Sequence, residues 1–182
     1  MKKDQAAAAT PGQDVKAVRR WRWKKWLAWL AVLGVVALVG AELFARLYLG
    51  LGDPPLSVAD SAMEYRFKPS MHYRRFGNNI AYNAYSMRSG PVTPHKTSPD
   101  ELRVMMIGDS VINGGSLTDD KDLASTLLQA RLTQAMGRPV YVGNISAGSW
   151  GPPNELAYVQ KYGWFDADVA VQVVAAGQWD DE

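Results

Sequence analysis

An apolar stretch near the N-terminus constrains this chain more than any other feature of its sequence. Residues 26–41 (WLAWLAVLGVVALVGA) contain no charged side chain, and after Glu42 the apolar character continues to Leu51. As an α-helix, residues 26–51 would measure about 39 Å at 1.5 Å per residue, which exceeds the roughly 30 Å hydrocarbon core of a bilayer. The sequence therefore predicts one transmembrane helix over residues 26–51.

Basic residues adjoin this apolar segment on its N-terminal side. They end a basic tail over residues 1–25 and are Arg19, Arg20, Arg22, Lys24 and Lys25. Positive charge beside a membrane span stays in the cytoplasm. We therefore expect the N-terminus on the cytoplasmic side of a bacterial inner membrane and everything after residue 51 on its outer side. The small residues at 39–41 also fit a signal-peptide cleavage site, which leaves a cleaved anchor as the alternative.

The charge distribution and the residue types exclude several classes of function. Residues 1–25 carry a net charge of +6 and residues 26–182 a net charge of −4, within an overall +2. A mildly acidic folded part does not favour nucleic-acid binding. Because the sequence contains no cysteine, it has no disulfide, thiol nucleophile or Cys-ligated metal. We expect neither a metal nor a cofactor.

Residues 52–101 have the character of a membrane-proximal lead-in. Prolines interrupt the segment repeatedly, and no helical period is sustained. Residues 63–67 and 80–85 are typical of short strands, and Asn78-Asn79 predicts a turn. We therefore expect a lead-in that contains a small hairpin.

The sequence has two histidines, and both lie in this lead-in. Neither His72 nor His95 has acidic or histidine neighbours in the sequence at a spacing typical of a metal site. We interpret both as surface residues, because a general base must be placed by a geometry that the sequence does not indicate here.

From residue 102 to residue 182 the pattern changes to alternating strands and helices. Short apolar runs predict three strands, at residues 103–107, 140–142 and 169–176. One intervening helix is predicted to begin with Asp120 or Asp122 as its N-cap and to end before Gly137, and another to run from Pro152 to Gly163. The order β-α-β-α-β indicates an α/β fold with a parallel sheet and right-handed crossovers.

Polar and glycine residues follow all three predicted strands, at 108–110, 144–151 and 177–180. In parallel sheets, binding and chemistry occur beyond the carboxyl ends of the strands. A serine in the first of these turns can expose its hydroxyl, and glycine lets a backbone N–H approach a substrate oxygen. The alternative interpretation is that these are ordinary turns, in which Gly, Asp and Ser are common.

Two of these segments resemble the SGNH (GDSL) hydrolases. Residues 107–114 (IGDSVING) are similar to the first sequence block of that family, and residues 144–151 (NISAGSWG) to the second. Residues 83–89 (NAYSMRS) are similar to a segment that precedes the domain in membrane-anchored bacterial members. The resemblance implies an incomplete flavodoxin-like sheet preceded by one transmembrane helix.

The resemblance also implies roles for individual residues. Ser110 would be the nucleophile that forms an acyl-enzyme, and its backbone N–H together with that of Gly151, or alternatively Gly148, would bind the oxyanion. The residues that would shape the turn without taking part in the chemistry are Gly108, Asp109 and Gly114.

The third and fourth blocks of the family are not matched. The family has G-x-N-D in the third block, whereas here Gly177 is followed by Gln178, Trp179 and Asp180, so that Gln178 is only a doubtful amide donor. The D-x-x-H that supplies the family's catalytic Asp and His does not occur. We expect that the chain is the first portion of a longer protein, and that further polypeptide or a partner covers the exposed third strand.

Several functions fit this combination. The resemblance and the predicted location imply hydrolysis of acyl esters, on acetylated polysaccharide or on lipid. One alternative is an O-acetyltransferase that uses the same serine on an exopolysaccharide, and another is a non-catalytic membrane-tethered remnant or binding module. A flavodoxin-like nucleotide or flavin binder is less favoured, because Val111-Ile112-Asn113 offers little phosphate-binding chemistry.

Overall fold

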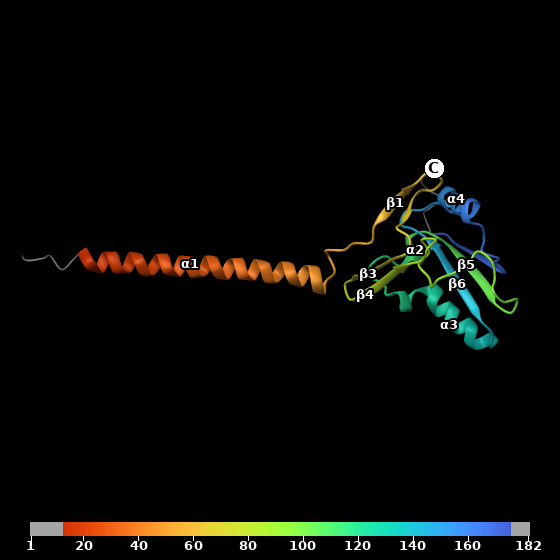
Figure 1. Ribbon diagram of the computed structural model, residues 1–182, viewed down its shortest axis with the longest axis horizontal. Helices are drawn as coiled ribbons and strands as arrows, with labels where there is room; N and C mark the ends of the chain where they lie inside the picture. Colours follow the sequence, from red (N-terminus) through yellow and green to blue (C-terminus); the bar gives the residue numbers. More distant parts are fainter. Residues whose placement is uncertain (1–12, 176–182) are drawn as a thin grey trace, which may run out of the picture. The chain divides into compact units, whose positions relative to one another are not determined.

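The computed structural model describes residues 13–175, with side-chain surroundings from residue 23 onward. The chain divides into two compact units, Met1–Phe44 and Ala45–Glu182. The first is helical and the second contains all the strands (Figure 1).

The N-terminal unit consists of helix α1 (Gln13–Leu43), which continues into the π-helical turn η1 (Phe44–Tyr48). Between Trp23 and Tyr48 the helix is long and apolar enough to cross a membrane, a property that it shares with signal sequences. Its large apolar side chains are exposed; Leu38, for example, is 72% accessible. A long apolar helix in this region is confirmed, but it begins at Gln13, so the basic residues 19–25 belong to it, and it ends at Tyr48, before the predicted end at residue 51.

The lead-in forms two antiparallel hairpins where one was expected. Strand β1 (Ser57–Asp60) pairs with β2 (Glu64–Phe67), and β3 (Met71–Arg75) pairs with β4 (Asn78–Tyr82). The predicted turn at Asn78-Asn79 is wrong, since both residues lie in β4. The turn is instead Phe76-Gly77, with φ of 52° and 83°. Positive φ at both central residues is typical of the type I′ turn that joins two strands through two residues.

The C-terminal half contains a parallel sheet of three strands, as the sequence predicted, and the strand order is β6-β5-β7. The strands are β5 (Leu102–Gly108), β6 (Val140–Ser146) and β7 (Val169–Val173). Gly108 at the end of β5 is opposite both Ser146 and Val173. All three strands therefore reach the same edge of the sheet with their carboxyl ends.

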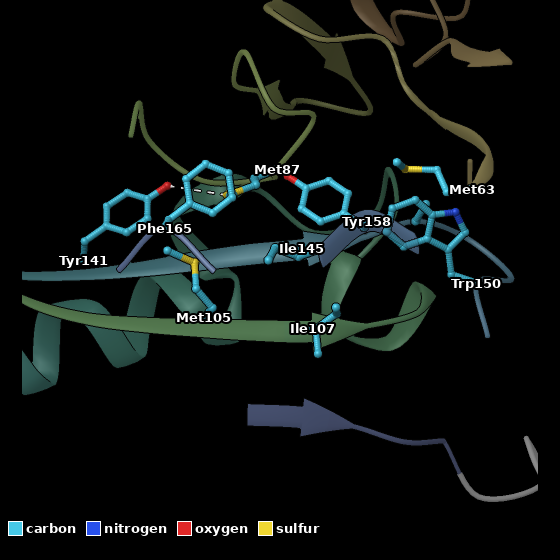
Figure 2. Packing of buried hydrophobic residues seen from close by; sticks show 10 residues of the cluster. Met63, Met87, Met105, Ile107, Tyr141, Ile145, Trp150, Tyr158 and Phe165 are labelled. Atoms are coloured by element: carbon cyan, nitrogen blue, oxygen red, sulfur yellow. Dashed lines mark hydrogen bonds between the residues drawn. The ribbon is translucent and has the colours of Figure 1, made fainter. Parts of the chain in front are cut away.

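Helices cover both faces of the sheet (Figure 1). Alternate residues of β5 point to opposite faces: Val104 and Met106 pack with α3 (Ala124–Met136), and Met105 and Ile107 pack with α4 (Pro152–Tyr162). The α4 face is lined with aromatic and methionine side chains, and Figure 2 shows Met105, Ile107 and Ile145 beside Tyr158 and Phe165. This double burial explains why residues 104–107 of β5 form a continuous apolar run.

The helix ends were predicted with mixed success. Neither Asp120 nor Asp122 is the N-cap of α3; both lie in the separate 3₁₀ turn η2 (Asp120–Asp122), and Leu123 occupies the N-cap position. Gly137 follows α3 with φ of 62°, the left-handed backbone conformation expected of a glycine that ends a helix. A short helix, α2 (Ser110–Asn113), was not predicted.

Strand β7 lies at the edge of the sheet. Three of its five residues are exposed and Val171 and Val173 are half-buried; Val169 is 45% accessible. The expectation of an exposed, Val- and Ala-rich third strand is confirmed for residues 169–173.

Candidate functional site

The polar cluster at the carboxyl edge of the sheet is centred on the turn after β5. Ser110 is the first residue of α2, and its side chain is exposed. Asp109 caps this helix, because its carboxylate accepts the Val111 N–H at 2.8 Å. Among residues 13–175, the Ser110 hydroxyl has no hydrogen-bond partner. The fold thus presents a free hydroxyl to solvent at the sheet edge.

Two glycines make this turn possible. A Cβ on Gly108 would lie 2.7 Å from the Val173 carbonyl oxygen of the neighbouring strand. Gly114 has φ of 73°, and a Cβ there would lie 2.7 Å from Leu123 Cδ2. The predicted structural roles of Gly108, Asp109 and Gly114 therefore have a direct steric or capping basis.

A buried amide–hydroxyl network joins α2 to β6. Asn113 Nδ2 donates to Ser146 Oγ at 3.1 Å, and Ser146 Oγ donates to Asn144 Oδ1 at 2.6 Å. Asn144 Nδ2 in turn donates to the Ile112 carbonyl of α2 at 2.8 Å. These three side chains are at most 2% accessible, so the network fixes α2 against the end of β6. Sequence reasoning missed it, because Asn144 and Ser146 were assigned only to a polar loop.

A second anchor comes from the lead-in. The Arg88 side chain is fully buried and donates to the carbonyls of Asn113, Gly115 and Thr118 at 2.5–2.6 Å. Its Nε also donates to the Asp120 carboxylate at 2.9 Å. Burial raises the pKa of Asp120, while the Arg88 hydrogen bond opposes that effect. Arg88 therefore holds the loop that follows α2 from the inside.

The two glycines named as oxyanion donors differ in availability. The Gly151 N–H already donates to Asn154 Oδ1 at 3.0 Å, at the start of α4. The Gly148 carbonyl accepts a hydrogen bond from the Tyr65 hydroxyl, whereas the Gly148 N–H has no acceptor among residues 13–175. Gly108 of β5 pairs with Ser146 of β6. Ser110 follows Gly108 by two residues and Gly148 follows Ser146 by two, so both come just after the same edge of the sheet. Gly148 is the freer donor. Gln178 lies outside the described residues.

A buried carboxyl group at this edge was not recognised in the sequence. Glu155, in the first turn of α4, is 4% accessible and accepts a hydrogen bond from Gln172 of β7 at 2.9 Å. Burial raises its pKa, and the negative charge of Asp109 adds to that effect. Only the tertiary contact between α4 and β7 identifies this residue.

Neither histidine is placed to serve Ser110. His95 is exposed beside Asp166, and its carbonyl accepts from Arg103, which lies at the opposite, amino end of β5. His72 is exposed on β3, where it pairs with Ala81. Both are surface residues, as predicted. Over the described residues 13–175, no group of three or more His, Asp or Glu side chains could hold a metal ion.

Comparison with known proteins finds no family model, no curated protein and no solved structure that matches this chain. The site combines an exposed hydroxyl, a backbone N–H of Gly148 that has no acceptor among residues 13–175, and a buried network that fixes α2 against β6. Such an arrangement suits attack on a carbonyl and stabilisation of the oxyanion that results.

Proposed function

We propose that the chain carries the serine part of an ester-hydrolysing site of the SGNH type. The observation that carries this proposal is the position of Ser110, an exposed hydroxyl at the start of a short helix that directly follows a buried strand. Buried hydrogen bonds of the Asn113–Ser146–Asn144 network and of Arg88 hold that helix in place. Rigid support of this kind is what a nucleophile needs, because misplacement by about 1 Å can cost about a hundredfold in rate.

The proposed reaction is acyl transfer to serine followed by hydrolysis. Ser110 Oγ attacks the ester carbonyl carbon and gives its proton to a base, the oxyanion forms beside the N–H groups of Ser110 and Gly148, and the alcohol leaves with a proton. Water then attacks the acyl-enzyme, and the carboxylic acid is released. We assign the second donor to Gly148 instead of Gly151, because the Gly151 N–H is already bonded to Asn154.

The general base is not a histidine of residues 13–175. His95 contacts Arg103 at the amino end of β5, and neither histidine hydrogen-bonds to Ser110 within residues 13–175. Serine with an ordinary pKa is a weak nucleophile, so turnover requires a base other than these two histidines.

The proposed location follows from the N-terminal helix and its charges. The basic residues 19–25 favour retention of the N-terminus in the cytoplasm, which places the sheet on the outer side of a bacterial inner membrane. Esters available there include O-acyl groups of polysaccharides and lipid esters. Either class supplies the neutral carbonyl that an exposed serine can attack.

The test uses the reading frame that encodes residues 1–182, expressed with any in-frame continuation. Ser110→Ala should lower kcat/KM for p-nitrophenyl acetate by about a thousandfold or more and abolish labelling by a fluorophosphonate. Ser57→Ala, an exposed serine on β1, is the matched control and should leave both unchanged. Ester hydrolysis that persists in Ser110→Ala would contradict the assignment.

A non-catalytic binding module is the second candidate, and the absence of a histidine near Ser110 favours it. In that case the wild-type protein would neither hydrolyse the ester nor react with the fluorophosphonate, although it would be folded. A melting transition alongside both negative results would decide for this candidate.

A further inference from the structure

A cavity separate from Ser110 lies between the two lead-in hairpins and the loop that follows α2. Its volume is about 300 Å³, and its walls include Phe67, Arg75, Phe76, Tyr82 and Ser116. This volume is at the lower end of the range for small-molecule sites. All of these residues belong to the C-terminal unit, so the cavity does not depend on the placement of α1.

Arg75 is the only charged residue that lines this cavity within the described part of the chain. Its Nε is buried and has no hydrogen-bond acceptor there, and its guanidinium carbon lies 5.2 Å from the centre of the Phe76 ring. The buried arginines elsewhere are satisfied: Arg88 pairs with Asp120, and Arg103 with Glu101. Because protein atoms enclose the Nε, a ligand in the cavity can reach the guanidinium of Arg75 only at its terminal nitrogens, which have no acceptor among residues 13–175.

The remaining walls are mainly apolar. The rings of Phe67 and Tyr82 stack with their centroids 4.3 Å apart, and Pro54 and Pro55 contribute further apolar surface. The Tyr82 hydroxyl donates to Asn113 Oδ1, and burial raises the pKa of Tyr82 to about 12, so the ring is neutral at physiological pH. The cavity thus offers one cationic fork surrounded by hydrocarbon.

We propose that this cavity binds an amphipathic oxyanion, meaning a phosphate or carboxylate group attached to an apolar chain. The oxyanion would accept from the two terminal nitrogens of Arg75, since a guanidinium matches two oxygens of such a group. The chain would lie against Phe67, Phe76 and Tyr82. A lipid headgroup and a soluble acyl or alkyl phosphate share this chemistry. The proposal does not require Ser110 to be catalytic.

The experiment titrates the full chain, purified in a neutral detergent, with hexyl phosphate, dihexanoyl phosphatidic acid and inorganic phosphate. Calorimetry gives affinity and stoichiometry, and ¹⁵N spectra of arginine side chains report the Nε resonance of Arg75. The test variant is Arg75→Gln. Arg74→Gln is the matched control, because Arg74 is the exposed neighbour on β3, points to the other face of the strand and does not line the cavity.

We expect saturable binding of hexyl phosphate at one site per chain, a shifted Arg75 Nε resonance, and a loss of affinity of about tenfold or more in Arg75→Gln but not in Arg74→Gln. Inorganic phosphate should bind more weakly. Tighter binding of dihexanoyl phosphatidic acid than of hexyl phosphate would identify a lipid headgroup as the source, and the reverse order a soluble ester.

A second variant tests the apolar wall independently. Phe76→Asn removes the ring, while asparagine tolerates the left-handed backbone at this position (φ 52°). Phe76→Asn should lower the affinity for hexyl phosphate and leave the affinity for inorganic phosphate unchanged. Equal affinities of Arg75→Gln and wild type, with melting curves showing both folded, would overturn the proposal. Equal binding of inorganic phosphate and hexyl phosphate would overturn its amphipathic part.

Discussion

At the scale of single residues, Arg88 has the largest structural consequence. Its buried guanidinium satisfies three loop carbonyls and the Asp120 carboxylate, and its own backbone N–H donates to the Asn144 carbonyl of β6 at 3.0 Å. Lead-in, α2 loop and sheet therefore meet at this one residue.

Replacement of Arg88 should be severely destabilising. Arg88→Gln leaves the Asp120 carboxylate without its ion pair and several carbonyls without partners, so we expect a loss of about 3–5 kcal/mol of unfolding free energy in urea titrations. Arg88→Lys keeps the charge but not the fork, and should recover only part of this loss. Arg138→Gln, at an exposed position, should change the unfolding free energy by about 0.5 kcal/mol or less and serves as the control. A similar small effect for Arg88→Gln would contradict the anchoring role.

Asp60 gives a pH dependence whose sign can be worked out. Its carboxylate accepts from Lys161 of α4 at 2.5 Å and from Arg66 of β2 at 3.0 Å. The Lys161 hydrogen bond is the main cause that lowers the pKa of Asp60 from 3.8 to about 2. A lowered pKa in the folded state stabilises the fold above the unfolded value, and this contribution is lost as pH falls from about 4 to about 2.

Asp60→Asn should therefore remove part of the acid sensitivity. Between pH 5 and pH 2 the wild type should lose about 1 kcal/mol more than Asp60→Asn, a figure reduced for solvent screening. Urea midpoints at several pH values measure the difference. Asp53→Asn, at an exposed position without an ion pair among residues 13–175, should follow the wild-type curve. Parallel curves for wild type and Asp60→Asn would refute the assignment.

At the scale of elements, β7 is the exposed edge of an otherwise covered sheet. Half of its backbone hydrogen-bonding groups face away from β5, and Val169 and Val174 are more than 40% accessible. An apolar edge of this kind pairs readily with other strands. We expect further polypeptide, or a partner, to cover β7 in the cell.

A charge on this edge should reduce self-association. Val169→Lys places a lysine where the valine is 45% accessible, and should lower light scattering and shift the detergent-solubilised protein toward monomer in size-exclusion chromatography. Leu127→Lys, at a position on α3 that is also 45% accessible, is the matched control and should not have this effect. Unchanged association in Val169→Lys would show that β7 is not the pairing edge.

At the scale of the whole molecule, the orientation across the membrane remains a prediction of the charge pattern. Because the sequence has no cysteine, single cysteines can report it. Ser57→Cys, on exposed β1, should react with a membrane-impermeant maleimide in cells whose outer membrane has been permeabilised. Lys3→Cys should react only after lysis. The opposite labelling pattern would invert the proposed orientation.

The lead-in is part of the fold of the C-terminal unit. Asp119 accepts from the Asn79 N–H at 2.9 Å and Asp120 from the Ala81 N–H at 2.7 Å, so β4 is fixed to the segment before α3. The Trp150 indole donates to the Tyr65 carbonyl at 3.0 Å. The expected membrane-proximal spacer is thus a layer that supports the candidate site.

The sequence by itself determined the features that depend on local periodicity and on turn chemistry. The apolar length of residues 26–51 predicted one long helix, and the run at 103–107 predicted a strand buried on both faces. Gly137 and Gly163 correctly marked two helix ends, because a positive φ favours glycine whatever the surroundings. The same local logic placed Ser110 at the end of a strand.

Only the tertiary structure decided what depends on partners far along the chain. Arg88 bonds to residues 25–32 positions away, and Asn113 to one 33 positions away, so no local pattern marks either as a support of the site. The same applies to Glu155 beside Gln172 and to the unpaired Nε of Arg75. Burial and hydrogen-bond satisfaction are properties of the packed chain, and sequence spacing does not encode them.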